Sequence, residues 1–336
     1  MADRFEYYLD VMPGETRAVV ARDGVCHQLF IERATDRIEH RLGTRLVGRV
    51  ARVEPGIRAA FIDIGTGELS GFLPMGKALR LDVGAKIEAL VTNEPRENKG
   101  PMLRYLAAAS GDVRVLEAGA DVKTRLSKLA NGQPIITGLE ALRMGLQAEE
   151  EGMASGVIRA DVGLDLCIER TRALIAVDID YAPQPGKDSR RARDSVNWIG
   201  LEEAARLLQL KAWGGIIAID LAGVHLQAES INSALRTIFG KSDGAVIGPL
   251  SRFGVAQLSL PWSVRPLDER IKMPENAALT ALRQLNEALL SQTGIPVWIL
   301  QCDPQWLTYL APLVEALGPR AKIIQGAPGR FTISEG

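Results

Sequence analysis

Two apolar runs in this chain each end in an aspartate, and these aspartates are the residues best suited to chemistry. The run at residues 174–179 contains Asp178 and is followed by Asp180, and the run at residues 214–219 is followed by Asp220. Each run predicts a short buried strand with a carboxylate at its C-terminal end, where α/β proteins place their catalytic and binding groups. We therefore expect Asp178 and Asp220 to meet in space.

Such a pair of carboxylates can hold a divalent metal ion. Two carboxylates a few ångströms apart repel each other unless one is protonated or a cation bridges them. Ligands that offer only oxygen favour Mg²⁺, with Mn²⁺ as the alternative. Such an ion can orient water and neutralise a phosphoryl oxygen during an in-line displacement. Asp180 would add a third oxygen ligand or support the other two, although a lone aspartate after a strand is more often a turn or cap residue.

The segment between the two runs predicts the element that aligns them. Residues 197–211 carry a helical stripe of apolar side chains, so a helix is expected to begin at Asn197 and to end before Gly214. A strand, a helix and a second strand form a crossover unit, in which the two strands lie parallel and close together. Their C-terminal ends then bring the two aspartates to one edge of the sheet.

A basic segment precedes this helix. Pro183, Pro185 and Gly186 exclude helix and central strand from the stretch that follows Asp180, and they predict a loop. We expect the basic residues of this loop to hold the phosphates that flank the reacting one. These residues are Lys187, Arg190, Arg191 and Arg193.

Short strands separated by glycine turns between residues 41 and 73 predict a small β-barrel. Alternation along residues 59–64 places Phe61 on the same face as Asp63, which is the expected solvent face. An exposed aromatic beside arginines is the arrangement that stacks single-stranded bases. The alternative is that Phe61 packs at the edge of the core or under residues 74–80. The arginines of residues 41–58 are Arg41, Arg45, Arg49, Arg52 and Arg58.

The remaining segments predict further helices and strands without chemistry of their own. A β-hairpin is expected around a turn at residues 22–24, and an amphipathic helix over residues 121–130. The expected parts are an N-terminal hairpin packed on the catalytic core (1–40), a barrel (41–108), a spacer (109–155), an α/β catalytic domain (156–265) and a C-terminal α/β subdomain (266–336).

Composition limits the class of protein. The 336 residues are 46% hydrophobic and 24% charged, as in an ordinary globular protein, and the net charge of −1 shows that the chain as a whole is not a basic nucleic-acid binder. There is no apolar run of 18 residues and no N-terminal signal core, so we expect a cytoplasmic protein without membrane spans. Cys26, Cys167 and Cys302 are too scattered for a zinc ribbon or a disulfide framework.

Ordered segments of the chain resemble the ribonuclease E/G family, in particular its shorter, ribonuclease-G-like members. The matching motifs include Gly48-Arg49-Val50, Glu54-Pro55-Gly56 and Gly71-Phe72-Leu73-Pro74 in the barrel. Asn98-Lys99-Gly100 is similar to the loop after the family's barrel, and Ser251-Arg252-Phe253-Gly254 to a run near the catalytic segment. The two runs that carry Asp178 and Asp220 resemble the catalytic segment itself.

The resemblance implies an α+β multidomain fold, with an OB-type RNA-binding barrel ahead of a deoxyribonuclease-I-like α/β catalytic domain and a C-terminal α/β piece. It implies that Asp178 and Asp220 bind Mg²⁺, and that Phe61, Phe72 and Lys99 grip a base near the scissile phosphate. Asp180 stands where the family usually has a supporting asparagine. The implied reaction is endonucleolytic hydrolysis of single-stranded, A/U-rich RNA in processing or decay, leaving 5′-phosphate and 3′-hydroxyl ends.

The departures from the family pattern are equally informative. The cysteine pair that shares zinc between subunits is missing, so we expect no zinc and no zinc-linked dimer or tetramer; any homodimer would form without zinc. Residues 110–155 are far fewer than the family's sensor and ribonuclease-H-like regions, the Arg-Thr dipeptide of the 5′-monophosphate pocket is not identified, and Gly244 falls near the place of a third pocket residue, an arginine. We therefore expect cleavage independent of the 5′ end, and no degradosome scaffold.

Two other functions remain open. The chain could be an RNA-binding protein of the same family whose nuclease activity is weak or lost, as the short middle region and Asp180 would suggest. It could also be a metal phosphoesterase acting on DNA or nucleotides, which the aromatic barrel disfavours.

Overall fold

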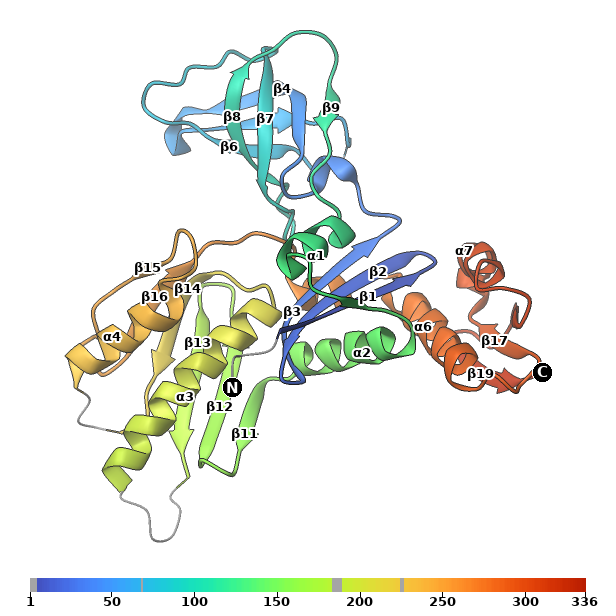
Figure 1. Cartoon of the computed structure of the whole chain (residues 1–336). Coiled ribbons are helices and arrows are strands. Elements are labelled where there is room, and N and C mark those ends of the chain that lie inside the picture. The colour runs from blue at the N-terminus through green and yellow to red at the C-terminus, as the bar shows by residue number, and fades with distance from the viewer. Residues whose placement is uncertain (1–4, 68, 183–188, 224–226) are drawn as a thin grey trace. The chain divides into compact units, whose positions relative to one another are not determined.

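The computed structural model describes residues 5–67, 69–182, 189–223 and 227–336, and it has a mixed α+β fold (Figure 1). The chain divides into two compact units. The first comprises residues 1–149 together with 264–336, and the second comprises residues 150–263. Over the described residues, no helix is both long and apolar enough to span a bilayer.

An N-terminal antiparallel meander forms the first sheet of the first unit. Asp23 and Gly24 both have positive φ, 51° and 77°, as a type I′ hairpin turn requires. The expected hairpin is therefore present between β2 and β3, and β1 and the short parallel strand β10 extend it in the order β10-β1-β2-β3. The strands are β1 (Phe5–Met12), β2 (Glu15–Arg22), β3 (Val25–Arg33) and β10 (Ile135–Ile136).

Helix α1 (Val122–Ala130) packs against this sheet. Its N-cap Asp121 accepts a hydrogen bond from the Thr124 amide at 2.7 Å, and its C-cap Asn131 adopts the left-handed conformation with φ 46°. Both caps confirm the amphipathic helix expected from the sequence. Leu126 and Ala130 lie in one buried cluster with Leu9 and other residues of β1 and β2.

A closed five-stranded barrel follows, as the strand and turn pattern predicts. The strands pair in the ring β4-β5-β6-β8-β7, which closes where β7 pairs with β4, and β9 (Arg114–Glu117) adds to the outside of β4. Two short 3-10 turns, Ile38–His40 and Pro55–Ile57, precede β4 and β5. The barrel strands are β4 (Arg45–Glu54), β5 (Ala59–Asp63), β6 (Gly71–Pro74), β7 (Lys86–Asn93) and β8 (Met102–Ala108).

The second unit is a six-stranded sheet with two helices on one face (Figure 1). The order is β11-β12-β13-β14-β16-β15, and β13 and β14 are parallel while their outer neighbours are antiparallel. The crossover expected between the two aspartate-bearing strands is confirmed. The elements are β11 (Gly156–Arg159), β12 (Leu164–Arg170), β13 (Ile175–Tyr181), α3 (Ser189–Leu210), β14 (Gly215–Asp220), α4 (Ala228–Phe239), β15 (Val246–Ile247) and β16 (Ala256–Leu260).

The C-terminal part of the first unit is a smaller α/β layer. Its sheet has the order β18-β17-β19, and α6 and α7 bury their apolar sides in one core with β17. Helix α2 (Leu139–Met153) runs across the boundary between the two units. The C-terminal elements are α5 (Leu267–Ile271), α6 (Asn276–Ser291), β17 (Trp298–Cys302), α7 (Pro304–Glu315), β18 (Ala321–Gln325) and β19 (Thr332–Glu335).

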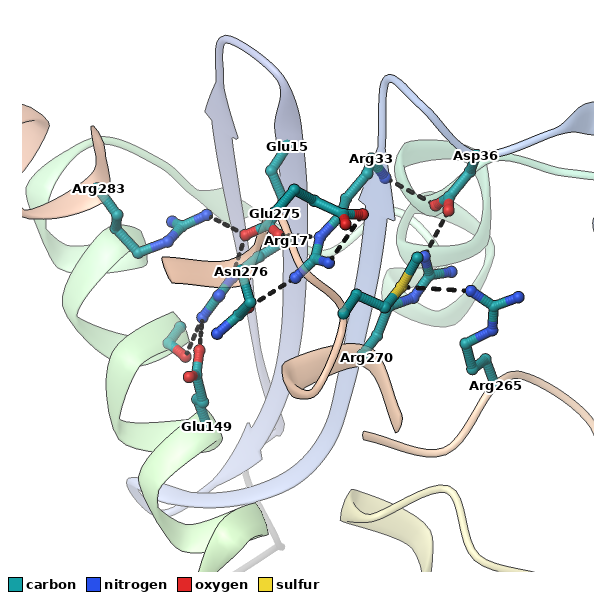
Figure 2. Close-up of polar contacts among 12 residues, drawn as sticks. Glu15, Arg17, Arg33, Asp36, Glu149, Arg265, Arg270, Glu275, Asn276 and Arg283 are labelled. Atoms are coloured by element: carbon teal, nitrogen blue, oxygen red, sulfur yellow. Dashed lines mark hydrogen bonds and ion pairs between the residues drawn. The ribbon is translucent and has the colours of Figure 1, made fainter. Parts of the chain in front are cut away.

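A buried ion cluster joins the N-terminal meander to helix α6 (Figure 2). The Glu15 carboxylate accepts from Arg17 at 2.7 Å, from Arg33 at 2.8 Å and from Arg283 at 2.6 Å, and the Glu15 side chain is fully buried. Arg17 also bonds Glu149 at 2.5 Å, so the cluster reaches helix α2 as well. One carboxylate thus holds strands β2 and β3 of the meander to α6, and Arg17 extends the cluster to α2.

The charge state of Glu15 follows from this arrangement. Burial disfavours the charged form and acts to raise the pKa, but the guanidinium groups of Arg17, Arg283 and Arg33 outweigh it and lower the pKa to about 2. A buried carboxylate with these partners is therefore ionised throughout the neutral range. Removing it would leave three buried arginines each with one carboxylate fewer, with Glu149, Glu275 and Asp10 as their remaining partners, and such a loss of one partner from a buried cluster is costly.

We predict that this cluster makes the first unit sensitive to acid. The Glu15 pKa is about 2 in the fold against 4.5 ordinarily, so its stabilisation is complete above about pH 5 and is lost as the pH falls towards 2. The loss should be about 2 kcal/mol between pH 7 and pH 3, measured as the free energy of urea-induced unfolding, with the remainder lost below pH 3.

Glu15→Gln should lower stability at neutral pH by about 3–5 kcal/mol and flatten this dependence. The control is Glu335→Gln, which alters an exposed carboxylate on β19 and should change neither. An unaltered acid slope in Glu15→Gln would contradict the assignment.

Candidate active site

Asp178 and Asp220 lie side by side at the ends of adjacent parallel strands. They are register partners in the pairing of β13 with β14, so their Cα atoms are separated by about one interstrand spacing, roughly 4.8 Å. Both side chains are exposed on the sheet face opposite α3 and α4. The structure thus brings together the two carboxylates that the sequence singles out.

The alternation of buried and exposed side chains along β13 places Asp178 on the open face. Ile175, Val177 and Ile179 are buried in the core with α3, while Asp178 and Asp180 alternate with them on the open face. A slip of one residue in register would bury both carboxylates and expose the apolar residues. The apolar core therefore fixes which face carries the acids.

Further carboxylates share this face. Asp180 is the register partner of Asp165 on β12, and both are exposed. The pKa of Asp178 is raised, first by partial burial and then by the negative charges of Asp180, Asp220 and Asp165. A cation bound here would offset this repulsion and favour the ionised form of Asp178.

The residues fit a magnesium site with few protein ligands. Within the part of the chain that the structure describes, no three His, Cys, Asp or Glu side chains converge closely enough to share one metal ion. Mg²⁺ is commonly held by one or two carboxylates and keeps several waters, so Asp178 and Asp220 are a sufficient protein ligand set.

Asn197 fixes the backbone immediately after Asp220. Its buried amide group donates to the Ala222 carbonyl at 3.0 Å and accepts from the Ala222 amide at 2.8 Å. These two hydrogen bonds tie helix α3 to the chain two residues beyond Asp220. Asn197 therefore positions the end of β14 rather than contacting a ligand.

The expected helix start at Asn197 is wrong, because α3 begins at Ser189 and Asn197 lies in its interior. The basic stretch has good helix formers and no proline or glycine after Gly186, so the helix extends upstream. Arg190, Arg191 and Arg193 accordingly lie in the first turns of α3 instead of on a loop. Lys187 lies outside the described residues.

Arg193 is placed beside the chain that leaves β14. A methyl group added at Gly223 would lie 3.6 Å from Arg193 Cδ, so the arginine passes over this glycine, three residues beyond Asp220. Arg191 is exposed near the start of α3. At least one residue of the expected phosphate-binding set therefore approaches the segment that follows the carboxylate pair.

The barrel carries the aromatic pair. Phe61 and Phe72 are register partners across β5 and β6, with ring centroids 5.7 Å apart in an edge-to-face arrangement. The Arg52 guanidinium lies 4.3 Å over the Phe61 ring. Both rings are half-buried, while Ala60 and Ile62 are fully buried in the barrel core, which confirms the alternation.

Lys99 is exposed on the loop between β7 and β8. Its amino group lies 3.3 Å from Glu97, in an exposed ion pair of little energetic weight. Lys99 is therefore accessible to a ligand of the barrel. The structure brings Phe61 and Phe72 into contact and leaves Lys99 on a separate segment of the same barrel.

Sequence reasoning missed Asp165 and Cys167. Cys167 is exposed and is the register partner of Asp178. It lies on β12, which flanks β13 on the side away from β14. The alternation of Leu164, Leu166 and Ile168 contains the signal, because it places the residues between them on the open face. The sequence predicts a strand over residues 165–170 and a tight turn before the strand that carries Asp178, but the register that sets Asp165 and Cys167 beside the aspartates was not worked out.

Comparison with known proteins supports a single family. A family model described as "Ribonuclease E/G family" matches residues 117–260, which include the sheet and helices of the second unit. Ribonuclease G of Haemophilus influenzae is 30% identical over 127 residues, 38% of this chain and 24% of that protein. Ribonuclease E of Buchnera aphidicola subsp. Acyrthosiphon pisum is 26% identical over 157 residues, 42% of this chain and 17% of that protein. The matches thus span a quarter or less of the relatives' lengths.

We predict that Asn197→Ala destabilises the second unit by about 1–3 kcal/mol, because the buried amide and carbonyl of Ala222 lose their partners. Urea-induced unfolding followed by circular dichroism measures the loss. Gln209→Ala removes an exposed amide side chain from the same helix and is the matched control. Equal stability of the two variants would show that Asn197 does not fix the end of β14.

Proposed function

We propose that the chain is a Mg²⁺-dependent endoribonuclease of the ribonuclease E/G family that acts on single-stranded RNA, because the model of that family matches residues 117–260. The observation that carries the proposal is the register pairing of Asp178 with Asp220 at the ends of two parallel strands. Their exposure on an open sheet face leaves room for an extended strand, and their mutual repulsion favours a bound cation.

We propose the following roles for these residues. Asp178 and Asp220 hold the metal ion, with Mn²⁺ as a substitute for Mg²⁺, and Asp180 supports them. The bound ion supplies charge neutralisation at the phosphoryl group and lowers the cost of forming hydroxide from water. Asn197 keeps Asp220 in register, and Arg193 and Arg191 hold neighbouring phosphates. We assign the same role to Arg190 and Lys187 from the sequence alone. The products are RNA ends with a 5′-phosphate and a 3′-hydroxyl.

We assign RNA binding to the barrel, as an OB-type domain. Phe61 and Phe72 form an aromatic pair, and the Arg52 guanidinium lies over the Phe61 ring. Lys99 is exposed on the loop that precedes β8. Aromatic platforms with adjacent cations bind single-stranded nucleic acid with little dependence on base identity, so a preference for A/U-rich RNA would come from the absence of stable secondary structure. The second unit is then the catalytic domain, of deoxyribonuclease-I-like type.

The proposed setting is cytoplasmic RNA processing or decay. Any homodimer would assemble without a zinc link, because Cys26, Cys167 and Cys302 offer no spacing suited to a shared ion.

A second candidate is an RNA-binding protein with weak or lost nuclease activity. The observation that favours it is Asp180, which places one more negative charge beside Asp178 than the asparagine of the family would. That charge would tighten metal binding or repel the RNA phosphate. Binding of RNA without cleavage distinguishes this candidate from the enzyme.

The direct test is cleavage of A/U-rich single-stranded RNA with and without Mg²⁺. Asp178→Asn and Asp220→Asn should each lower the rate by more than about 100-fold, because each removes half of the protein ligand set. Asp243→Asn, an exposed aspartate between α4 and β15 in the same unit, is the matched control and should retain full activity. Cleavage that survives both site substitutions would reject the assignment.

We also predict that cleavage does not depend on the 5′ end. Oligonucleotides with a 5′-monophosphate and with a 5′-hydroxyl should react at rates within about threefold, since charge-assisted hydrogen bonds to a bound phosphate would give a difference of more than tenfold. Single-turnover rates of the two substrates measure this. A preference for the monophosphate above tenfold would reveal a 5′-end pocket.

A further inference from the structure

Phe253 is the most exposed large hydrophobic residue in the described part of the chain. Its side chain is 92% accessible, and the neighbouring Arg252 is also exposed. A single exposed apolar residue is common on protein surfaces. Phe253 differs from such residues in two ways: the turn that carries it is held by hydrogen bonds, and the turn lies at the end of the sheet where Asp178 and Asp220 are found.

The turn around Phe253 is held by its own hydrogen bonds. The Ser251 amide donates to the Val255 carbonyl at 3.0 Å, and the Gly254 amide donates to the Ser251 carbonyl at 3.1 Å. The Ser251 hydroxyl accepts from the amides of Phe253 at 3.3 Å and Val255 at 3.0 Å. Gly254 adopts φ 81°, a conformation that side chains disfavour.

Both sides of this turn are anchored in the second unit. Leu250 packs against the core and donates its amide to the Asn232 side chain at 3.2 Å, which ties the turn to α4. On the other side, Ala256 is fully buried and begins β16. The aromatic ring is therefore presented from a fixed base, so that ligand binding has little backbone ordering to offset.

Strand register places the turn next to the carboxylate pair. Ile219 is the partner of Ala256 in the antiparallel pairing of β14 with β16, so the chain before Ala256 runs past the level of Asp220. Phe253 is three residues before Ala256, which puts it on the order of 10 Å from Asp220 in the backbone. The turn and the two aspartates thus belong to the same end of one sheet.

We infer that Phe253 is a stacking platform for a nucleobase of the RNA strand whose phosphate lies at Asp178 and Asp220, with Arg252 beside the adjoining phosphate. This assignment rests on the proposed RNA substrate. A lone ring suits a base, since every base offers a π-face, whereas a protein partner would need a wider apolar patch. The platform orients one nucleotide next to the scissile bond from within the catalytic unit itself.

The test is binding of short single-stranded RNA in EDTA, with 2-aminopurine placed at successive positions. For the wild type, fluorescence should be quenched on binding when the 2-aminopurine occupies the position that stacks on Phe253. Phe253→Ala should abolish that quenching and weaken binding about 5- to 150-fold, whereas Phe253→Trp should preserve both. Circular dichroism melting should be unchanged, because the side chain is exposed.

Val246→Ala is the matched control. Val246 is 66% exposed on β15 and pairs with Ser259, towards the opposite end of the sheet, so its removal should alter neither affinity nor quenching. If wild type and Phe253→Ala bind RNA equally with the same quenching, the platform is refuted while the proposed nuclease stands. If the wild type binds no RNA either in EDTA or with Ca²⁺ in place of Mg²⁺, both the platform and the proposed function are refuted.

Discussion

The parallel pairing of β13 with β14 is the constraint on which the second unit depends. It sets Asp178 against Asp220, two like charges at neighbouring positions in adjacent strands. Without a bound cation the two carboxylates repel each other. They remain adjacent because Val177 and Ile219, on the other face of the sheet, are buried in the core beneath α3 and α4. The apolar face stabilises the sheet. The open face carries the two carboxylates, whose mutual repulsion a bound cation would offset.

The surroundings of this pair are built to hold it in place. The Asn197 side chain satisfies both backbone polar groups of Ala222, so the chain cannot drift after Asp220 without leaving buried groups unpaired. Arg193 crosses Gly223, and the rigid turn with Phe253 precedes β16 on the other side of β14. Positive charge and an aromatic ring therefore border the carboxylates on elements of the same unit. In the first unit, the buried Glu15 has a comparable structural role, since its three arginine partners connect the meander to helix α6.

Local patterns predicted much of this architecture. The two apolar runs with a helical stripe between them were enough to predict parallel strands and adjacent aspartates, because crossover handedness and strand polarity leave few alternatives. The turn at Asp23 and Gly24 and the extent of α1 were also predicted, since such signals act within a few residues. Asn197 was misinterpreted because its amide group bonds Ala222, 25 residues away, and a capping residue and a buried tertiary contact look alike in sequence. Asp165, Cys167 and the Glu15 cluster depend on strand order and on contacts over more than a hundred residues, which no local period reveals.

The central claim is that Asp178 and Asp220 together form one metal site. Titration of the protein with Mn²⁺, followed by electron paramagnetic resonance of the free ion, tests it without RNA and without turnover. We expect one tightly bound ion per chain in the wild type, displaced by excess Mg²⁺. Asp178→Asn and Asp220→Asn should each lose that ion, while Asp243→Asn should bind it normally. Equal Mn²⁺ binding by the wild type and the two site variants would contradict it.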